Sequence, residues 1–115
     1  MEEASHFDLG KIADRIREQA GEDRIWVTLH GHHEMVKEGI FYETLRKALL
    51  QCQVIENYPD HQRGPCCLVC GWVGSARFLH VVCTTMREVI VVITVYEPTA
   101  PKWVTPFQRG GKDEM

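Results

Sequence analysis

Three apolar segments joined by very short connections constrain the fold of this chain most strongly. Residues 66–73 (CCLVCGWV), 78–84 (FLHVVCT) and 89–96 (VIVVITVY) are rich in β-branched side chains, and only four residues separate each from the next. Segments of this composition form β-strands, and connections this short favour antiparallel pairing of neighbours. The last segment is apolar on both faces, so we expect it to be central in the sheet or covered on both sides. Residues 54–59 (VIENYP) predict one further strand, which Pro59 ends.

The N-terminal half has helical periodicity instead. Residues 5–23 carry apolar side chains three and four apart and predict a first helix. Residues 24–29 predict a short strand or extended segment, and residues 30–40 and 42–51 predict two helices that form a hairpin around Gly39. Helices followed by a set of strands indicate an α+β fold. We therefore predict N-terminal helices packed on one face of a three- to four-stranded antiparallel sheet, in the order α-(β)-α-α-β-β-β-β.

The length and charge of the chain limit its class. A chain of 115 residues suits one domain, which we place at 1–109, with Trp103 and Phe107 folding back on it and residues 110–115 as a disordered tail. No apolar run approaches the roughly 20 residues that cross a bilayer, and the acidic N-terminus is unlike a signal peptide. We therefore expect a cytoplasmic protein with no membrane partner. The net charge of −3 argues against a strongly basic nucleic-acid binder but leaves room for a local basic patch.

Neither the histidines nor the cysteines indicate a metal or redox centre. His30 and His33 would share one face of a helix, but zinc needs three or four ligands and no further ligand is spaced to join them. Cys67 and Cys70 fall on a predicted strand, where a three-residue spacing places them on opposite faces. The five cysteines are odd in number, and we expect them to pack as small buried apolar groups. The sequence thus predicts no metal and no cofactor.

His80 is the polar residue that the pattern explains least, because it lies within an apolar strand. A buried histidine needs a hydrogen-bond partner, and its pKa suits acid–base chemistry near neutral pH. Thr94 and Tyr96 share one face of the next strand. A two-residue turn would place His80 opposite Ile93, and one residue more would place it opposite Thr94, near Tyr96. His80 is therefore either part of a polar row with Thr94 and Tyr96 or a structural histidine bonded to a loop carbonyl.

Several short motifs spread over residues 26–109 form a specific combination. They are His30 with Met35, Glu38, Gly39 and Ile40, then VIENYP (54–59), RGP-CLV-G between Arg63 and Gly71, LHVV (79–82), VITVYEP (92–98), and finally Trp103, Phe107 and Arg109. In this combination the chain resembles a bacterial and archaeal family known only as domain of unknown function 4258.

The resemblance implies a function. Members of that family are often encoded beside a small zinc-finger protein of the YgiT type, which looks like an antitoxin. The chain would then be the toxin of a type II toxin–antitoxin pair, with a fold similar to the helix-plus-antiparallel-sheet layout of RelE- and MqsR-like ribonucleases. The implied activity is that of a metal-independent endoribonuclease, and the implied partners are RNA and the zinc-finger protein.

The resemblance also implies which residues act. The recurrent polar positions of the family fall on His30, Arg63, His80, Tyr96 and Arg109 of this chain. His30 and His80 would serve as acid and base, Tyr96 would donate a proton or stack on a base, and Arg63 and Arg109 would bind the substrate. For Arg63, which lies in a polar loop, a solvated side chain without a ligand is the other interpretation.

A non-enzymatic protein–protein interaction module is the alternative function. Such a module would present a strand edge or the aromatic C-terminal segment to another protein. The two functions differ in what they require of His80. A catalytic histidine must be reachable from solvent and lie near Tyr96 or Arg63, whereas a structural histidine must be enclosed with a fixed partner.

Overall fold

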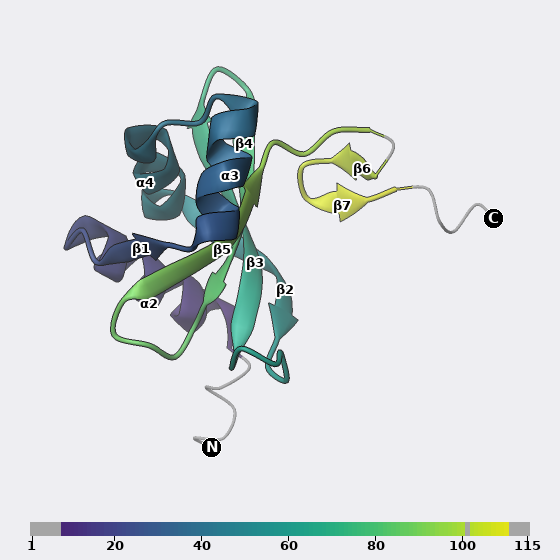
Figure 1. The fold of residues 1–115 in the computed structure, drawn as a ribbon. Helices are drawn as coiled ribbons and strands as arrows, with labels where there is room; N and C mark the ends of the chain where they lie inside the picture. Colours follow the sequence, from purple (N-terminus) through teal and green to yellow (C-terminus); the bar gives the residue numbers. More distant parts are fainter. Residues whose placement is uncertain (1–7, 101, 111–115) are drawn as a thin grey trace.

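The computed structural model describes residues 8–100 and 102–110, which form three helices, a five-stranded sheet and a two-stranded sheet (Figure 1). The helices are α2 (Leu9–Gly21), α3 (Leu29–Glu38) and α4 (Tyr42–Leu50). The strands are β1 (Ile25–Val27), β2 (Cys52–Tyr58), β3 (Cys66–Gly74), β4 (Arg77–Thr84), β5 (Ile90–Tyr96), β6 (Trp103–Thr105) and β7 (Gln108–Arg109). The α+β class and the N-terminal position of the helices are confirmed.

The larger sheet has five strands in the order β1-β5-β4-β3-β2, and it is mixed. Strands β2 to β5 form the predicted antiparallel meander, but β1 pairs parallel to β5, with Ile25 opposite Ile90. The prediction of a purely antiparallel sheet of three to four strands was therefore wrong. Helices α3 and α4 separate β1 from the meander along the chain, and such a long connection allows a parallel pair. Because β1 flanks it, β5 lies inside the sheet, as its two apolar faces predicted.

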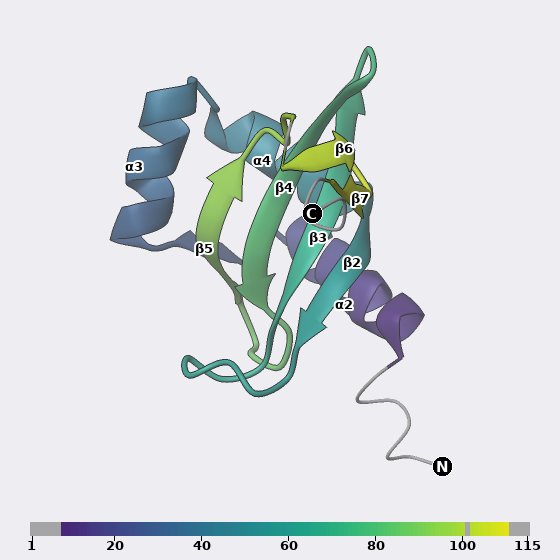
Figure 2. The same ribbon diagram turned by 90° about the vertical axis from the view of Figure 1, so that its right-hand side faces the viewer.

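The elements form layers on either side of the large sheet. Helices α2 and α4 cover one face, and the β6–β7 hairpin lies on the opposite face (Figure 2). Helix α3 runs beside β5 at the edge of the sheet, where its C-terminal Glu38 accepts a hydrogen bond from the Glu97 N–H at 2.9 Å. Within residues 8–100 and 102–110, no helix is long and apolar enough to cross a membrane.

Helix α2 illustrates how the sequence positions a helix on this sheet. Asp8 caps its N-terminus by accepting a hydrogen bond from the Lys11 N–H. Ile12 and Ile16 are buried four residues apart on the face that meets the sheet. Gln19 on the same helix is buried as well, and its amide donates to the carbonyls of Arg87 and Glu88 at 2.7 and 2.8 Å. The helix therefore also fixes the connection between β4 and β5. The start of the predicted first helix, residues 5–7, lies outside the described residues.

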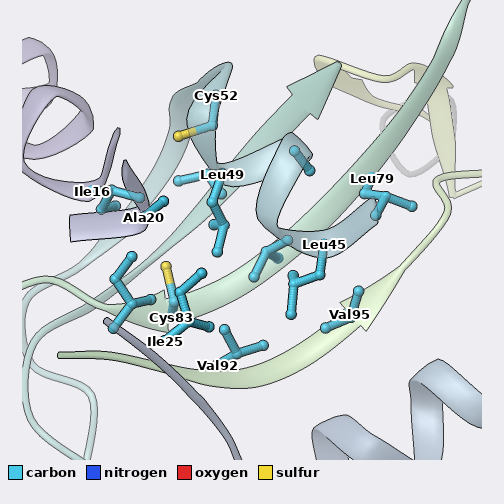
Figure 3. Packing of buried hydrophobic residues seen from close by; sticks show 14 of the residues in the cluster. Ile16, Ala20, Ile25, Leu45, Leu49, Cys52, Leu79, Cys83, Val92 and Val95 are labelled. Carbon is cyan, nitrogen blue, oxygen red and sulfur yellow. The ribbon is translucent and has the colours of Figure 1, made fainter. Parts of the chain in front are cut away.

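The main core fills the space between α2, α4 and the sheet (Figure 3). Leu45 and Leu49 of α4 are completely buried in this core, as are Val92 and Val95 of β5. Cys52, Cys67 and Cys83 are buried in this core as free thiols, as predicted. Cys70 is also buried and free, but it lies outside the core cluster, on the other face of β3, so the predicted separation of Cys67 and Cys70 is confirmed.

The register of β4 and β5 differs from both predicted alternatives. His80 lies opposite Tyr96, and Val82 lies opposite Thr94. A β-bulge follows, so that Cys83 lies opposite Val92 and Ile93 is the extra residue. The connection between the strands spans residues 85–89, which is longer than the predicted turn of two or three residues. The longer connection and the bulge together shift the pairing, and they place His80, Thr94 and Tyr96 on one face of the sheet.

The C-terminal segment folds back as a hairpin, which the sequence did not predict. Trp103 is buried as expected, whereas Phe107 remains partly exposed and contacts Phe78 edge-on, with ring centroids 5.4 Å apart. The hairpin closes with a hydrogen bond from the Gly110 N–H to the Lys102 carbonyl at 2.9 Å. Apart from Gly110, the tail expected at 110–115 lies outside the described residues.

Candidate functional site

A cluster of polar side chains lies beneath the β6–β7 hairpin. We call the sheet face that carries this hairpin the hairpin face. The register places His80 between Cys70 on β3 and Tyr96 on β5, so these three side chains share that face. Strand β2 adds Glu56 and Tyr58, which are bonded to one another. Four adjacent strands thus contribute chemistry-bearing side chains to one area of the sheet.

His80 is completely buried and has a partner on each ring nitrogen. Its Nε2 lies 2.6 Å from the Pro106 carbonyl oxygen, in the loop between β6 and β7, and its Nδ1 lies 3.2 Å from the Tyr96 hydroxyl. A carbonyl only accepts hydrogen bonds, so Nε2 carries a proton and donates it. In the neutral ring, Nδ1 is then the acceptor, and the Tyr96 hydroxyl donates to it. The Trp103 indole packs on the imidazole at right angles, with ring centroids 4.3 Å apart.

Glu56 holds the second polar contact of the hairpin. Arg109 on β7 donates to both carboxylate oxygens of Glu56, from Nε at 2.6 Å and from Nη2 at 3.0 Å. Tyr58 donates a third hydrogen bond to the same carboxylate. The Arg109 guanidinium also lies over the Trp103 ring, 4.6 Å from its centroid. The hairpin therefore makes polar contacts with both His80 and Glu56, which are the two groups of the cluster best suited to proton transfer.

Burial and pairing set the charge of each group. The hydrogen bonds from Arg109 hold the pKa of Glu56 below its usual value, against the effect of burial, so Glu56 is a carboxylate. Burial lowers the pKa of His80, and the Pro106 carbonyl and Glu56 oppose this shift. Burial raises the pKa of Tyr96, which keeps its proton. At neutral pH the cluster therefore holds one ion pair and a neutral His80–Tyr96 pair.

The lowered pKa of His80 predicts a pH-dependent stability. In the unfolded chain His80 takes up a proton below about pH 6.5, whereas the folded chain resists protonation, so the unfolded state binds more protons. We expect the free energy of unfolding, measured in urea, to fall by up to about 1 kcal/mol between pH 7.5 and 5.5 through this group. His80→Gln should remove that part of the decrease. An identical decrease in the variant and the wild type would contradict the assignment of the shift to His80.

The structure brings together three of the five residues that the resemblance implied, namely His80, Tyr96 and Arg109. His30 lies in the first turn of α3 with an exposed side chain, and its charged neighbour is Glu34 at 3.8 Å. Arg63 is exposed in the loop between β2 and β3. No contact with the cluster is found for either residue within the described part of the chain. No group of three or more metal-ligating side chains is found there either.

Sequence reasoning missed Glu56, Tyr58 and the Pro106 carbonyl. Glu56 gave a usable signal, because it is an acidic residue within the apolar strand segment VIENYP. Tyr58 follows it two residues later and so points to the same face. The Pro106 carbonyl gave no signal, since any residue of the loop offers a carbonyl.

Comparison with known proteins identifies one similarity. The sequence model of a family described as Domain of unknown function (DUF4258) matches residues 27–97, which are more than half of the chain. The matched segment contains Glu56, His80 and Tyr96, while Trp103 and Arg109 of the hairpin follow it. No curated protein and no solved structure matches the chain.

Proposed function

The chain belongs to the family described as Domain of unknown function (DUF4258), and from this premise we propose that it is a toxin-like, metal-independent endoribonuclease. The observation that carries the proposal is the arrangement of His80 and Glu56 on one sheet face, each bonded to the same hairpin. Tyr96 and Arg109 complete a set with a proton donor, a proton acceptor and a cation. This is the set of groups that cleavage of RNA by its own 2′-hydroxyl requires.

The proposed reaction assigns one role to each group. The Glu56 carboxylate takes the proton of the 2′-hydroxyl as the 2′-oxygen attacks the adjacent phosphorus. Protonated His80 gives its Nε2 proton to the departing 5′-oxygen, and the products are a 2′,3′-cyclic phosphate and a 5′-hydroxyl. Tyr96 orients the imidazole through Nδ1, because a phenol can donate to the neutral ring and accept from the charged one. Arg109 moves with the hairpin, and once it is released from Glu56 its guanidinium is free to balance the negative charge on the phosphate. Glu56 thus takes the role that the resemblance gave to His30.

The proposal requires the hairpin to move. His80 is completely buried, and its Nε2 is occupied by the Pro106 carbonyl. Displacement of residues 102–110 would release Nε2 and the Glu56 carboxylate together, because Pro106 and Arg109 belong to the same hairpin. It would also hydrate His80 and so return its pKa towards the usual value, which favours the protonated form that the reaction needs. The closed hairpin is therefore the resting state in this proposal.

A second candidate function is a protein-binding module, and the complete enclosure of His80 favours it. In that case His80 and Glu56 only hold the hairpin in place. Helix α3 and the residue before α4 offer apolar side chains to a partner, since Leu29, Val36 and Phe41 are 71%, 81% and 76% exposed. Under the first proposal the same surface would serve a neutralising partner, such as a small zinc-finger protein of the antitoxin type.

Expression of the chain in a bacterial host separates the two functions. We expect growth arrest and cleavage of total RNA by the wild type, and a loss of cleavage of about 100-fold or more in His80→Ala. His80→Gln, which keeps a hydrogen-bond donor, guards against simple unfolding, and His32→Ala removes an exposed histidine as a matched control. Growth arrest that persists in both His80 variants would show that the toxic activity does not depend on His80. A folded wild type that leaves growth and RNA intact would favour the binding module.

A further inference from the structure

An open pocket lies on the hairpin face at the end of the sheet that the hairpin leaves uncovered. It has a volume of about 330 Å³ and is lined by Trp26, Arg63, Thr84, Arg87, Val91 and Ile93. Thr84 ends β4, the strand on which His80 lies four residues earlier. At about 3.3 Å per residue, this spacing puts the pocket about 13 Å along the sheet from His80. The pocket and the His80 cluster are therefore separate sites on one continuous face.

The two arginines of the pocket lie in two loops, Arg63 between β2 and β3 and Arg87 between β4 and β5. Hydrogen bonds join these loops to each other and to helix α2. The Thr85 N–H donates to the Pro65 carbonyl at 3.1 Å, and Arg87 Nη2 donates to the Arg63 carbonyl at 3.3 Å. Gln19 binds the Arg87 carbonyl from helix α2. The backbone of both loops is thus held in place by hydrogen bonds, which reduces the conformational entropy that the loops lose when the two guanidinium groups bind a ligand.

Trp26 supplies an exposed aromatic surface to the same pocket. It lies on the edge strand β1 opposite Val91, and 67% of its surface is accessible. An indole offers a large flat ring on which a planar ligand can stack. An exposed indole beside two guanidinium groups suits a ligand that has a flat ring and a negative charge.

The charge around the pocket is also positive, although the chain as a whole is acidic. Within residues 8–100 and 102–110, neither Arg63 nor Arg87 forms an ion pair with a carboxylate. By contrast, Arg109 in the His80 cluster is paired with Glu56, and Arg77 at the opposite end of β4 is paired with Glu97. Two unpaired arginines and one exposed indole are the combination that binds phosphate and stacks a base.

We propose that this pocket binds a nucleotide of single-stranded RNA, with its base on Trp26 and its flanking phosphates on Arg63 and Arg87. The choice of RNA as the ligand rests on the proposed ribonuclease function. The inference adds a binding site that lies outside the reacting groups and that anchors the strand along β4 and β5 on its way to His80. It also gives Arg63 a role in substrate binding, although Arg63 makes no contact with the His80 cluster.

Binding of a short fluorescein-labelled single-stranded RNA, methylated at every 2′-oxygen, tests the site by fluorescence anisotropy. The methylated strand cannot be cleaved by the proposed reaction, so binding is measured separately from catalysis. Trp26→Ala should weaken binding about tenfold or more through lost stacking. Arg63→Gln and Arg87→Gln should each weaken it and lower the slope of log affinity against log salt by about one.

Matched controls come from the other end of the sheet. Trp72→Ala removes a second exposed indole, and Arg77→Gln removes a charge from the other end of β4. Both should bind like the wild type. Equal binding by Trp26→Ala and Trp72→Ala would overturn the proposed site, and so would a wild type that binds no RNA at low salt. Binding of an acidic peptide instead, through the same three residues, would overturn the RNA assignment.

The outcomes also separate this site from the proposed function. If RNA binding depends on Trp26 but the protein cleaves no RNA, the proposed binding site is supported and the proposed reaction is contradicted. If cleavage depends on His80 but binding does not depend on Trp26, the reaction is supported and the binding site is contradicted.

Discussion

Gly71→Ala is expected to lower the free energy of unfolding by about 3 kcal/mol or more, because the added methyl group has no space. Gly71 lies on β3 beneath α4, and a Cβ there would lie 2.6 Å from the carbonyl carbon of Ala48 and still closer to its oxygen. The obstacle is the helix backbone, which cannot rotate aside as a side chain can. The loss is large against the roughly 5–15 kcal/mol that stabilises a small domain. Urea unfolding followed by circular dichroism measures it.

Gly10→Ala is the matched control for this substitution. Gly10 is exposed in α2, and among the described residues a Cβ there would meet the Asp8 side chain alone, at 3.4 Å. Alanine should leave the free energy of unfolding unchanged or raise it, by at most about 0.5–1 kcal/mol, since Gly10 lies in the first turn. A Gly71→Ala protein as stable as the wild type would contradict the close packing of α4 on β3.

Trp103→Ala is expected to open the hairpin and to raise the rate of RNA cleavage by a factor of about 10 to 100. Trp103 is 4% exposed, yet it lies outside the core cluster between the helices and the sheet. Its loss should therefore weaken the docking of residues 102–110, by about 3 kcal/mol, and spare the rest of the fold. Each 1.4 kcal/mol shifts an equilibrium about tenfold, so the open population should rise by roughly 100-fold.

The control for this prediction is Val104→Ala on the same strand. Val104 is 66% exposed, so its truncation should leave both docking and cleavage unchanged. Hydrogen exchange at the amides of β6 and β7 would show whether the hairpin has opened in Trp103→Ala. An open hairpin without faster cleavage would contradict the resting-state role of the hairpin.

The sequence predicted the meander and the class of the fold because local patterns determine both. Short connections force residues 66–96 to pair antiparallel, and helical spacing distinguishes residues 9–21 from strands. The pairing of β1 could not be predicted in this way. A strand of three residues has too little pattern to specify a partner, and β5 lies more than 60 residues later in the chain.

The candidate site was predictable only in part, for a related reason. His80 and Tyr96 were recognisable as polar residues in apolar strands. Their pairing, however, depends on a β-bulge after Val82, and no residue type in the sequence predicts that bulge. Arg109 entered through the family resemblance, whereas its partner Glu56 was visible only once β2 was placed at the edge of the sheet. The enclosure of His80 depends on a backbone carbonyl of Pro106, which side-chain patterns cannot reveal.

The central claim is that the hairpin closes a ribonuclease site built on His80 and Glu56, and product analysis tests it most directly. Purified wild type, Trp103→Ala and the double variant Trp103→Ala/His80→Ala would be incubated with a short single-stranded RNA and with the same strand methylated at its 2′-oxygens. We expect the unmethylated strand alone to be cut, to 2′,3′-cyclic phosphate and 5′-hydroxyl ends, faster by Trp103→Ala than by the wild type and not by the double variant. Intact RNA with Trp103→Ala, in a protein that remains folded and whose hairpin exchange shows opening, would contradict the claim.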